Sequence, residues 1–275
     1  MPDKKTLSAY YDWLTRPPSK RTLKDRAVLR ELVRLHQKYP TLGLDSLHQL
    51  TKPKIPCSRG KVHKLMKQAN IHSKRKKAYK CTTNSKHTKP VAPNLLKRDF
   101  SCNEPNRVWV SDITYIPTGE GWLYLAVVKD LCLKKVVGYA FSNRIDTKLV
   151  LDALHMAVKR QNPKKGLIFH SDRGVQYCSK DFSNALYRLQ FLQSMSRKGD
   201  PYDNAVAENF FSCLKCECTH LTYFPTRSSA QTEIFRYIEV FYNRFRPHSG
   251  IRWLAPIVFE LLLLEGKNEC LSFSS

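Results

Sequence analysis

Residues 108–142 read VWVSDITYIPTGEGWLYLAVVKDLCLKKVVGYAFS, and this stretch decides the fold. Three runs within it are rich in β-branched and aromatic residues, namely 108–116, 122–128 and 135–141. Such residues favour strands, whereas Gly119 and Gly121 favour a turn between the first two runs. Because the connections are short, we predict three consecutive strands arranged as an antiparallel meander.

Beyond residue 142 the pattern alternates between helix and strand. Apolar residues at helical spacing predict helices at 148–159, 181–189, 204–218 and 229–244. Short apolar runs predict two further strands, at 167–169 and 191–195. Three antiparallel strands followed by alternating helices and strands indicate an α/β domain over residues 99–275, with a mixed sheet and helices packed on its faces.

Charge separates the front of the chain from the rear. The 275 residues include 47 basic and 23 acidic residues, a net charge of +24. Residues 1–100 hold 25 basic and 6 acidic residues, a net of +19, and residues 101–275 have a net of only +5. The strong positive charge of residues 1–100 is expected to neutralise a polyanion. We favour nucleic-acid binding over the alternative of a charged surface without a ligand.

Two helices are predicted within residues 1–72. The first spans residues 22–38, with Thr22 as its N-cap. The second begins after Ser58 and carries four basic residues, Arg59, Lys61, Lys64 and Lys67. Two short helices of which the later is basic resemble a helix-turn-helix DNA-binding unit. A small helical packing unit with a solvated charged face is the alternative.

Residues 73–98 have a different composition. The run Lys74, Arg75, Lys76 and Lys77 is followed by threonine, asparagine, serine, lysine and proline with little periodicity. We interpret this segment as a basic linker that contacts phosphates.

Several classes of protein are disfavoured. No stretch of 18 apolar residues is present, which argues against a membrane span, and the first residues lack the apolar core of a secretory signal. The nine cysteines are odd in number and scattered, which indicates reduced thiols rather than a disulfide framework.

Three acidic residues stand at positions that suggest chemistry. Asp112 lies in the first predicted strand, Asp172 follows the strand 167–169, and Glu208 lies in the helix 204–218. A carboxylate at the end of a buried strand is costly unless a cation compensates it, and oxygen ligands suit Mg²⁺ or Mn²⁺. Two such ions can clamp the attacking and leaving oxygens of a phosphoryl transfer. Taken singly, each acid also has a structural explanation, as a strand-end cap, a turn former or a helix-surface residue.

The motifs around these acids resemble those of the DDE transposases of bacterial insertion sequences, in the retroviral-integrase-like branch. In particular, the chain resembles the second-reading-frame protein of a two-frame element. The matching motifs are Trp-x-x-Asp-Ile-Thr-Tyr at 109–115, His-Ser-Asp-Arg-Gly-x-Gln-Tyr at 170–177 and Asp-x-x-Asp-Asn-Ala-x-x-Glu-Asn-Phe-Phe at 200–211. The 35 residues between Asp172 and Glu208 are the gap typical of the family. Tyr242-Asn243 and Arg246-Pro247-His248 match its C-terminal motif.

This resemblance implies an RNase H-like catalytic core with Asp112, Asp172 and Glu208 as catalytic and metal-binding residues for two Mg²⁺ or Mn²⁺ ions. It implies that Lys215 contacts DNA near the cut. Such an enzyme binds the terminal inverted repeats, cleaves one strand with metal-activated water and transfers the 3′-hydroxyl to a second strand.

The same resemblance implies DNA, further copies of the chain and the upstream-frame protein of the element as partners, with no membrane. The expected location is the bacterial cytoplasm, at the nucleoid. Two alternatives remain open, a metal-dependent nuclease without strand transfer and a non-catalytic DNA-binding regulator.

Other polar residues near the motifs are given structural roles. Asp203 is predicted to cap the helix of Glu208, Asp130 to stabilise the end of a strand, and His170 to be a hydrogen-bond partner. Cys213, Cys216, Cys218 and His220 cluster at the end of the same helix. We favour helix packing over a zinc site there, because no second cysteine pair stands at a supporting distance.

Overall fold

A computed structural model of the chain describes residues 10–11, 14–74, 91–97, 99, 102–197 and 205–266, with backbone only at 205–207. The chain divides into two compact units, Met1–Lys74 and Arg75–Ser275. Within the described ranges, no helix is long and apolar enough to cross a membrane.

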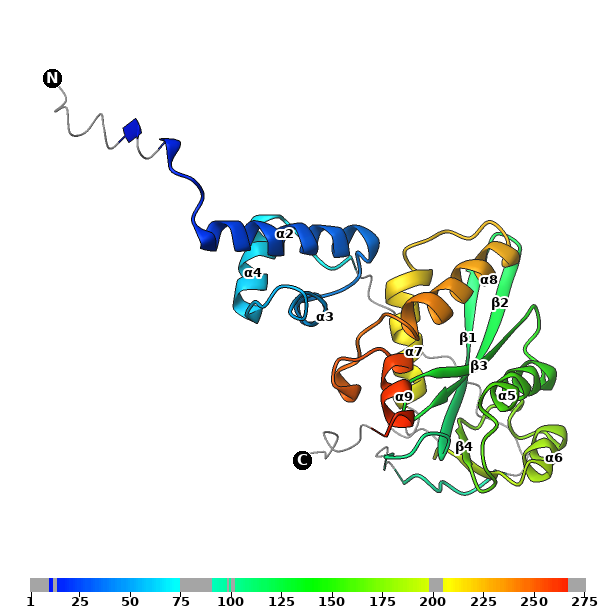
Figure 1. Cartoon of the computed structure of the whole chain (residues 1–275). Helices are drawn as coiled ribbons and strands as arrows, with labels where there is room; N and C mark the ends of the chain where they lie inside the picture. Colours follow the sequence, from blue (N-terminus) through cyan, green and yellow to red (C-terminus); the bar gives the residue numbers. More distant parts are fainter. Residues whose placement is uncertain are drawn as a thin grey trace. The chain divides into compact units, whose positions relative to one another are not determined.

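Three helices of the described residues pack together in the first unit (Figure 1). They are α2 (Lys20–Lys38), α3 (Leu44–Thr51) and α4 (Arg59–Gln68). Apolar residues from all three form its core: Val28, Leu32, Leu35, Leu47, Val62, Leu65 and Met66. Ser58 caps α4 as predicted, because its hydroxyl accepts a hydrogen bond from the Lys61 N–H at 3.2 Å.

Two predictions for this unit were wrong. The N-cap of α2 is Ser19 rather than Thr22, and the Ser19 hydroxyl accepts from the Thr22 N–H at 3.2 Å. Helix α3 was not predicted, because Gly43 before it and Pro53 and Pro56 after it are residues that favour turns. Leu47 of α3 is fully buried, so tertiary packing stabilises a helix that its local sequence signals only weakly.

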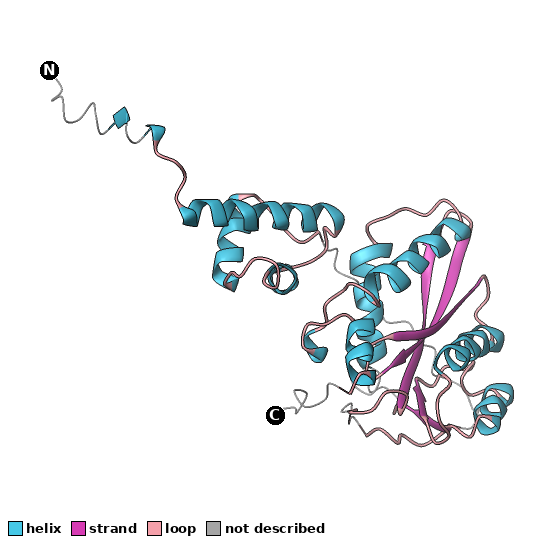
Figure 2. Cartoon of the chain, in the orientation of Figure 1, coloured by secondary structure: helices cyan, strands magenta, loops and turns pink. Residues whose placement is uncertain are grey.

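A five-stranded sheet in the order β3-β2-β1-β4-β5 organises the second unit (Figure 2). The predicted meander is confirmed, with β1 (Val108–Thr118), β2 (Gly121–Asp130) and β3 (Val136–Ser142) antiparallel in succession. β4 (Ile168–Ser171) pairs parallel with β1, and β5 (Leu192–Met195) pairs parallel with β4. This is the mixed RNase H-like sheet that the sequence led us to expect.

Helices cover both faces of the sheet because successive residues of a strand point to opposite sides. Ala126 and Val128 of β2 belong to a core shared with α5 (Thr147–Gln161) and α6 (Lys180–Arg188). On β3, Gly138 lets α5 approach closely, since a Cβ there would collide with the Ala153 carbonyl oxygen.

The opposite face carries the C-terminal helices. Leu125 and Val127 of β2 pack with residues of α7 (Ala205–Leu214), α8 (Arg227–Arg236) and the π-helix η3 (Tyr237–Tyr242). A second π-helix, η2 (Lys215–Thr219), continues α7, and η4 (Ser249–Ile251) and α9 (Pro256–Leu264) follow. The helices predicted at 204–218 and 229–244 therefore each change from α to π before they end.

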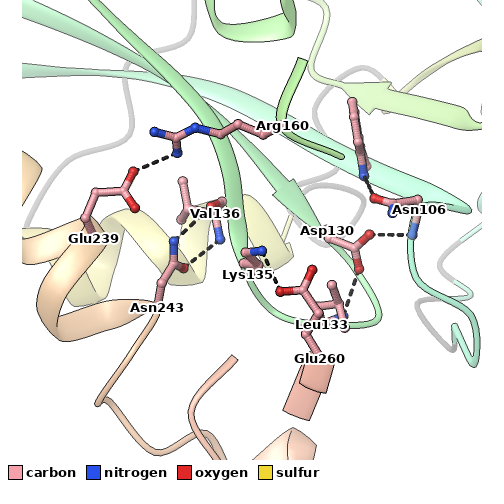
Figure 3. A network of polar contacts seen from close by, with 10 residues as sticks. Asn106, Asp130, Leu133, Lys135, Val136, Arg160, Glu239, Asn243 and Glu260 are labelled. Carbon is pink, nitrogen blue, oxygen red and sulfur yellow. Dashed lines mark hydrogen bonds and ion pairs between the residues drawn. The ribbon is translucent and has the colours of Figure 1, made fainter. Parts of the chain in front are cut away.

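Two polar contacts fix the ends of strands (Figure 3). Asn243 accepts from the Val136 N–H at 3.0 Å and donates to the Val136 carbonyl at 2.9 Å, as a neighbouring strand would. Asp130 is fully buried and accepts from the backbone N–H groups of Asn106 and Leu133 at 2.7 and 2.8 Å. The structural role predicted for Asp130 is confirmed.

Candidate active site

Asp112 lies half-buried in the middle of β1, opposite Val127 of β2. Residues directly opposite each other in an antiparallel pair share a face, so Asp112 faces the side that α7 covers. Its Oδ1 accepts a hydrogen bond from the Ile113 N–H at 2.8 Å.

Asp172 comes directly after β4. Ser171, the last residue of β4, pairs with Ser111 in the parallel ladder, which brings Asp172 next to Asp112. The Asp172 Oδ1 accepts from the Gly174 N–H at 2.9 Å, a turn contact that holds the carboxylate in place. A Cβ on Gly174 would lie 3.0 Å from this oxygen, so a residue without a side chain suits the turn.

Glu208 lies exposed in the first turns of α7. Phe210 and Phe211, two and three residues further on, are buried in the core that also contains Val127. This packing lays α7, which carries Glu208, over the sheet face that carries Asp112.

The three carboxylates interact electrostatically. Burial raises the pKa of Asp112 well above its ordinary value, Asp172 raises it further, and Glu208 adds a smaller contribution. Burial and Asp172 likewise raise the pKa of Glu208. The structure therefore brings together the three acids that the sequence singled out, and their charges repel one another.

Oxygen-only donors in mutual repulsion fit a divalent cation such as Mg²⁺. Among the described residues, no three His, Cys, Asp or Glu side chains converge closely enough to hold an ion as they stand. A bound cation would offset the effects of burial and of the neighbouring carboxylates that raise the pKa of Asp112.

Lys215 is the first residue of η2, seven residues after Glu208. Its ammonium nitrogen lies 5.5 Å from the centroid of the Tyr115 ring on β1. Its charge lowers the pKa of Asp112, opposite in sign to the effect of the acids. Lys215 therefore lies close enough to Asp112 for its charge to act on that carboxylate.

The basic residues expected to bind DNA in the first unit differ in their surroundings. Arg59 forms an ion pair with Asp45 at 2.6 Å, and Lys61 forms one with Asp25 at 2.7 Å. Three others are exposed, Lys64, Lys67 and Lys74. The remaining three, Arg75, Lys76 and Lys77, lie outside the described residues, as do Asp200 and the predicted cap Asp203.

Several residues near the acids were missed from the sequence. The Tyr177 hydroxyl lies 2.8 Å from the Ser111 hydroxyl, and the nearby charges of Asp112 and Asp172 add to burial in raising the pKa of Tyr177. Tyr177 closes the His-Ser-Asp-Arg-Gly-x-Gln-Tyr motif, which was the available signal. Glu217 and Arg246 form a buried ion pair that no local pattern indicated.

The remaining candidates have structural partners. The His170 ring nitrogens lie 2.8 Å from the Ser194 hydroxyl and 3.2 Å from the Ser196 hydroxyl, which supports the hydrogen-bonding role. The Cys213 sulfur accepts from Arg246 Nη2 at 3.3 Å, so this thiol packs against a cation.

Comparisons with known proteins match most of this core. Models described as integrase core domain match residues 103–201 and 189–256. An uncharacterised 31 kDa protein of insertion element IS600 from Shigella sonnei is 41% identical over 256 residues, which cover 92% of this chain and 93% of that protein.

Named transposases are similar over the same span. Transposase InsF of insertion sequence IS3A from Escherichia coli (strain K12) is 38% identical, covering 92% of this chain and 89% of its own length. The transposase of IS904 from Lactococcus lactis is 39% identical, covering 89% of this chain and 98% of its own length. The catalytic core domain of BIV integrase superimposes with a TM-score of 0.43 at 16% identity, covering 60% of this chain and 99% of that one. The chain therefore belongs to the IS3-type insertion-sequence transposases, a family of DDE polynucleotidyl transferases with an integrase core.

Proposed function

We propose that Asp112, Asp172 and Glu208 are the catalytic acids with which this transposase cleaves and joins DNA. The observation that carries the proposal is the mutual effect of their charges, since the pKa of Asp112 responds to both other acids. An acid whose pKa is raised by burial together with neighbouring carboxylates is a common feature of catalytic sites.

The three carboxylates would hold two Mg²⁺ or Mn²⁺ ions between them. When bound, these ions supply the Lewis acidity that activates an attacking oxygen and stabilises a leaving oxygen. The Gly174 N–H holds one oxygen of Asp172, and the Ile113 N–H holds one oxygen of Asp112. These backbone contacts orient the two carboxylates before any ion arrives.

The reaction follows as two displacements at phosphorus. In the first, water attacks a phosphodiester at the element's end, the bond from phosphorus to the 3′-oxygen breaks, and a 3′-hydroxyl and a 5′-phosphate remain. In the second, that 3′-hydroxyl attacks a phosphodiester of the target strand, so that one bond forms as one breaks. Neither step needs a covalent link to the protein.

Lys215 would bind a phosphate of the element's end next to the cut. Its place beside Asp112 and above the Tyr115 ring supports this role. Arg59, Lys61, Lys64, Lys67 and the basic segment at Lys74, Arg75, Lys76 and Lys77 would bind the backbone of the terminal repeats.

The joining of two ends requires that they be held together, so we expect the transposase to act as a multimer of this chain. The upstream-frame protein of the same element is the second protein partner that we propose. The substrate of the transposase is bacterial DNA, so we place the enzyme in the cytoplasm, at the nucleoid.

A strand-transfer assay tests the function. A labelled end with a free 3′-hydroxyl is mixed with unlabelled acceptor DNA and Mg²⁺, and joined products are counted beside cleaved ones. The proposal predicts joining. Cleavage without joining would identify a nuclease, and binding with neither reaction would identify a regulator.

A further inference from the structure

A buried ion pair lies behind the turn of helix that begins at Lys215. Arg246 Nε donates to Glu217 Oε2 at 2.8 Å, and Nη2 donates to Oε1 at 2.9 Å. The Tyr237 hydroxyl donates to the same Oε2 at 2.9 Å. The Glu217 side chain is 0% exposed and that of Arg246 is 13% exposed. This fork-to-fork geometry fixes position and angle together.

Such a pair is an expensive way to gain stability. Removing two charges from water costs several kcal/mol per ion, and well-packed apolar residues often serve as well. What the pair adds is a defined geometry, because the planar guanidinium and carboxylate meet in one orientation. The role of the Glu217–Arg246 pair therefore depends on which residues lie in the turn of helix that the pair holds in place.

The segment that Glu217 fixes carries Lys215 on its other side. Residues two apart on a helix are roughly 200° apart around its axis. Lys215 contacts the Tyr115 ring at the active-site side, whereas Glu217 points back toward Arg246 and Tyr237. Holding the back of this turn therefore sets the direction of Lys215 at its front.

The turn itself is a π-turn. The His220 N–H donates to the Lys215 carbonyl at 2.9 Å, five residues back, where an α-helix would use a bond over four. A π-turn is a rare conformation that surrounding contacts must hold. The bidentate contact from Arg246 supplies such a hold within the turn.

Arg246 is in turn fixed to the sheet. Three residues earlier, Asn243 makes its two hydrogen bonds to Val136 of β3. The Arg246 N–H donates to the Phe241 carbonyl at 2.7 Å, and its guanidinium carbon lies 5.8 Å from the Tyr242 ring centroid. A continuous set of contacts thus runs from β3 through Arg246 and Glu217 to the turn of Lys215.

We propose that Arg246 is a positioning residue for strand transfer. It holds the π-turn through Glu217 and thereby aims Lys215 at the phosphate beside the catalytic acids. This inference rests on the proposed role of Lys215, and it gives Arg246 no contact with DNA or with the reacting atoms.

A double-mutant cycle separates positioning from simple stabilisation. Joining rate is measured against end concentration for wild type, Arg246→Lys, Lys215→Ala and the double variant. Arg246→Lys keeps the charge but loses the fork. We expect it to raise the half-saturating end concentration about tenfold alone and to have almost no further effect when Lys215→Ala is present. The Mg²⁺-induced rise in melting temperature should be unchanged.

Arg160→Lys is the matched control. Arg160 of α5 pairs with Glu239 of η3 at 2.7 Å, and Glu239 also accepts from the Tyr139 hydroxyl of β3 at 3.0 Å. Arg160→Lys should leave the half-saturating concentration as in wild type. Glu217→Gln is the second variant, since it keeps the shape of the partner while removing its charge, and it should reproduce the effect of Arg246→Lys.

Three results would overturn the inference. One is an equal rise in the half-saturating end concentration when Arg246→Lys is made in wild type and in Lys215→Ala, since the effect of Arg246 would then be independent of Lys215. Another is failure of both Arg246→Lys and Glu217→Gln to fold, which would make the pair structural. The third is a Lys215→Ala variant that joins normally, which would leave nothing to position. Failure of the proposed function itself would be seen in a different result, namely normal joining by variants of Asp112, Asp172 or Glu208.

Discussion

The Lys215 ammonium nitrogen lies 5.5 Å from the centroid of the Tyr115 ring. Tyr115 belongs to β1, the strand that carries Asp112 three residues earlier. A lysine over an aromatic face keeps its charge while its stem is held in place. The contact joins η2, which continues the helix of Glu208, to the strand of Asp112.

Lys215→Ala should weaken engagement of the element's end. A charge-assisted hydrogen bond to phosphate is worth roughly 1.5–3 kcal/mol, so the half-saturating end concentration should rise about 10- to 100-fold. The measurement is the joining rate against end concentration, with exposed Lys164→Ala as the surface control. If both variants behave alike, Lys215 is an ordinary surface lysine and DNA runs along another face.

DNA binding should depend strongly on salt. Each phosphate neutralised by residues 1–100 releases counterions, and the slope of log affinity against log salt falls by about 0.9 per contact. Lys64→Ala and Lys67→Ala should each remove one phosphate contact and so make the slope less steep by about 0.9. Arg59→Ala should change it less, because Asp45 already pairs with Arg59 at 2.6 Å. A slope near zero for wild type would contradict backbone binding by this unit.

Lys129 makes the stability of the second unit depend on pH. It is 5% exposed on β2, and burial, with a smaller effect of Lys134, lowers its pKa from 10.5 to about 7. Between about pH 7 and 10.5 the unfolded chain therefore binds the extra proton, and the free energy of unfolding rises with pH by up to about 1.4 kcal/mol per unit.

Lys129→Met removes this effect while keeping the volume of the side chain. The variant should be more stable than wild type by a few kcal/mol at about pH 6, and its advantage should shrink by about pH 9. Denaturant unfolding at both pH values measures the difference. An equal difference at both would show that Lys129 does not titrate with folding.

Binding of Mg²⁺ should be visible in stability alone. In EDTA, Asp112→Asn should be more stable than wild type by at least about 1 kcal/mol, because one of three repelling charges is gone. Adding Mg²⁺ should raise the melting temperature of wild type and leave that of Asp112→Asn nearly unchanged. Equal stabilisation of both proteins by Mg²⁺ would place the ion elsewhere.

Most of the catalytic fold could be predicted from periodicity. β-branched runs gave β1, β2 and β3, and apolar spacing gave α5 and α6 within about two residues of their ends. The three acids could be singled out because each follows or lies within an element whose type is clear, and because the motifs around them resemble those of a known family. Parallel pairing of β4 with β1 then brings Asp112 and Asp172 together.

What escaped prediction depends on packing between distant residues. Helix α3 has weak local signals and is stabilised by buried Leu47. The change from α to π at Lys215 and Tyr237 leaves no mark in apolar spacing, since the same residues would also fit an α-helix. Glu217 and Arg246 are 29 residues apart, and a charged pair at that separation is invisible until the chain has folded.

The central claim is that Asp112, Asp172 and Glu208 carry out the chemistry, and strand transfer tests it most directly. Joining of the element's own ends to acceptor DNA in Mg²⁺ is measured for wild type, Asp112→Asn, Asp172→Asn and Glu208→Gln, with end binding measured in parallel. We predict that each variant binds the ends as wild type does and joins them about 1,000-fold more slowly or not at all. Near-normal joining by any one of the three would contradict the account and remove that residue from the active site.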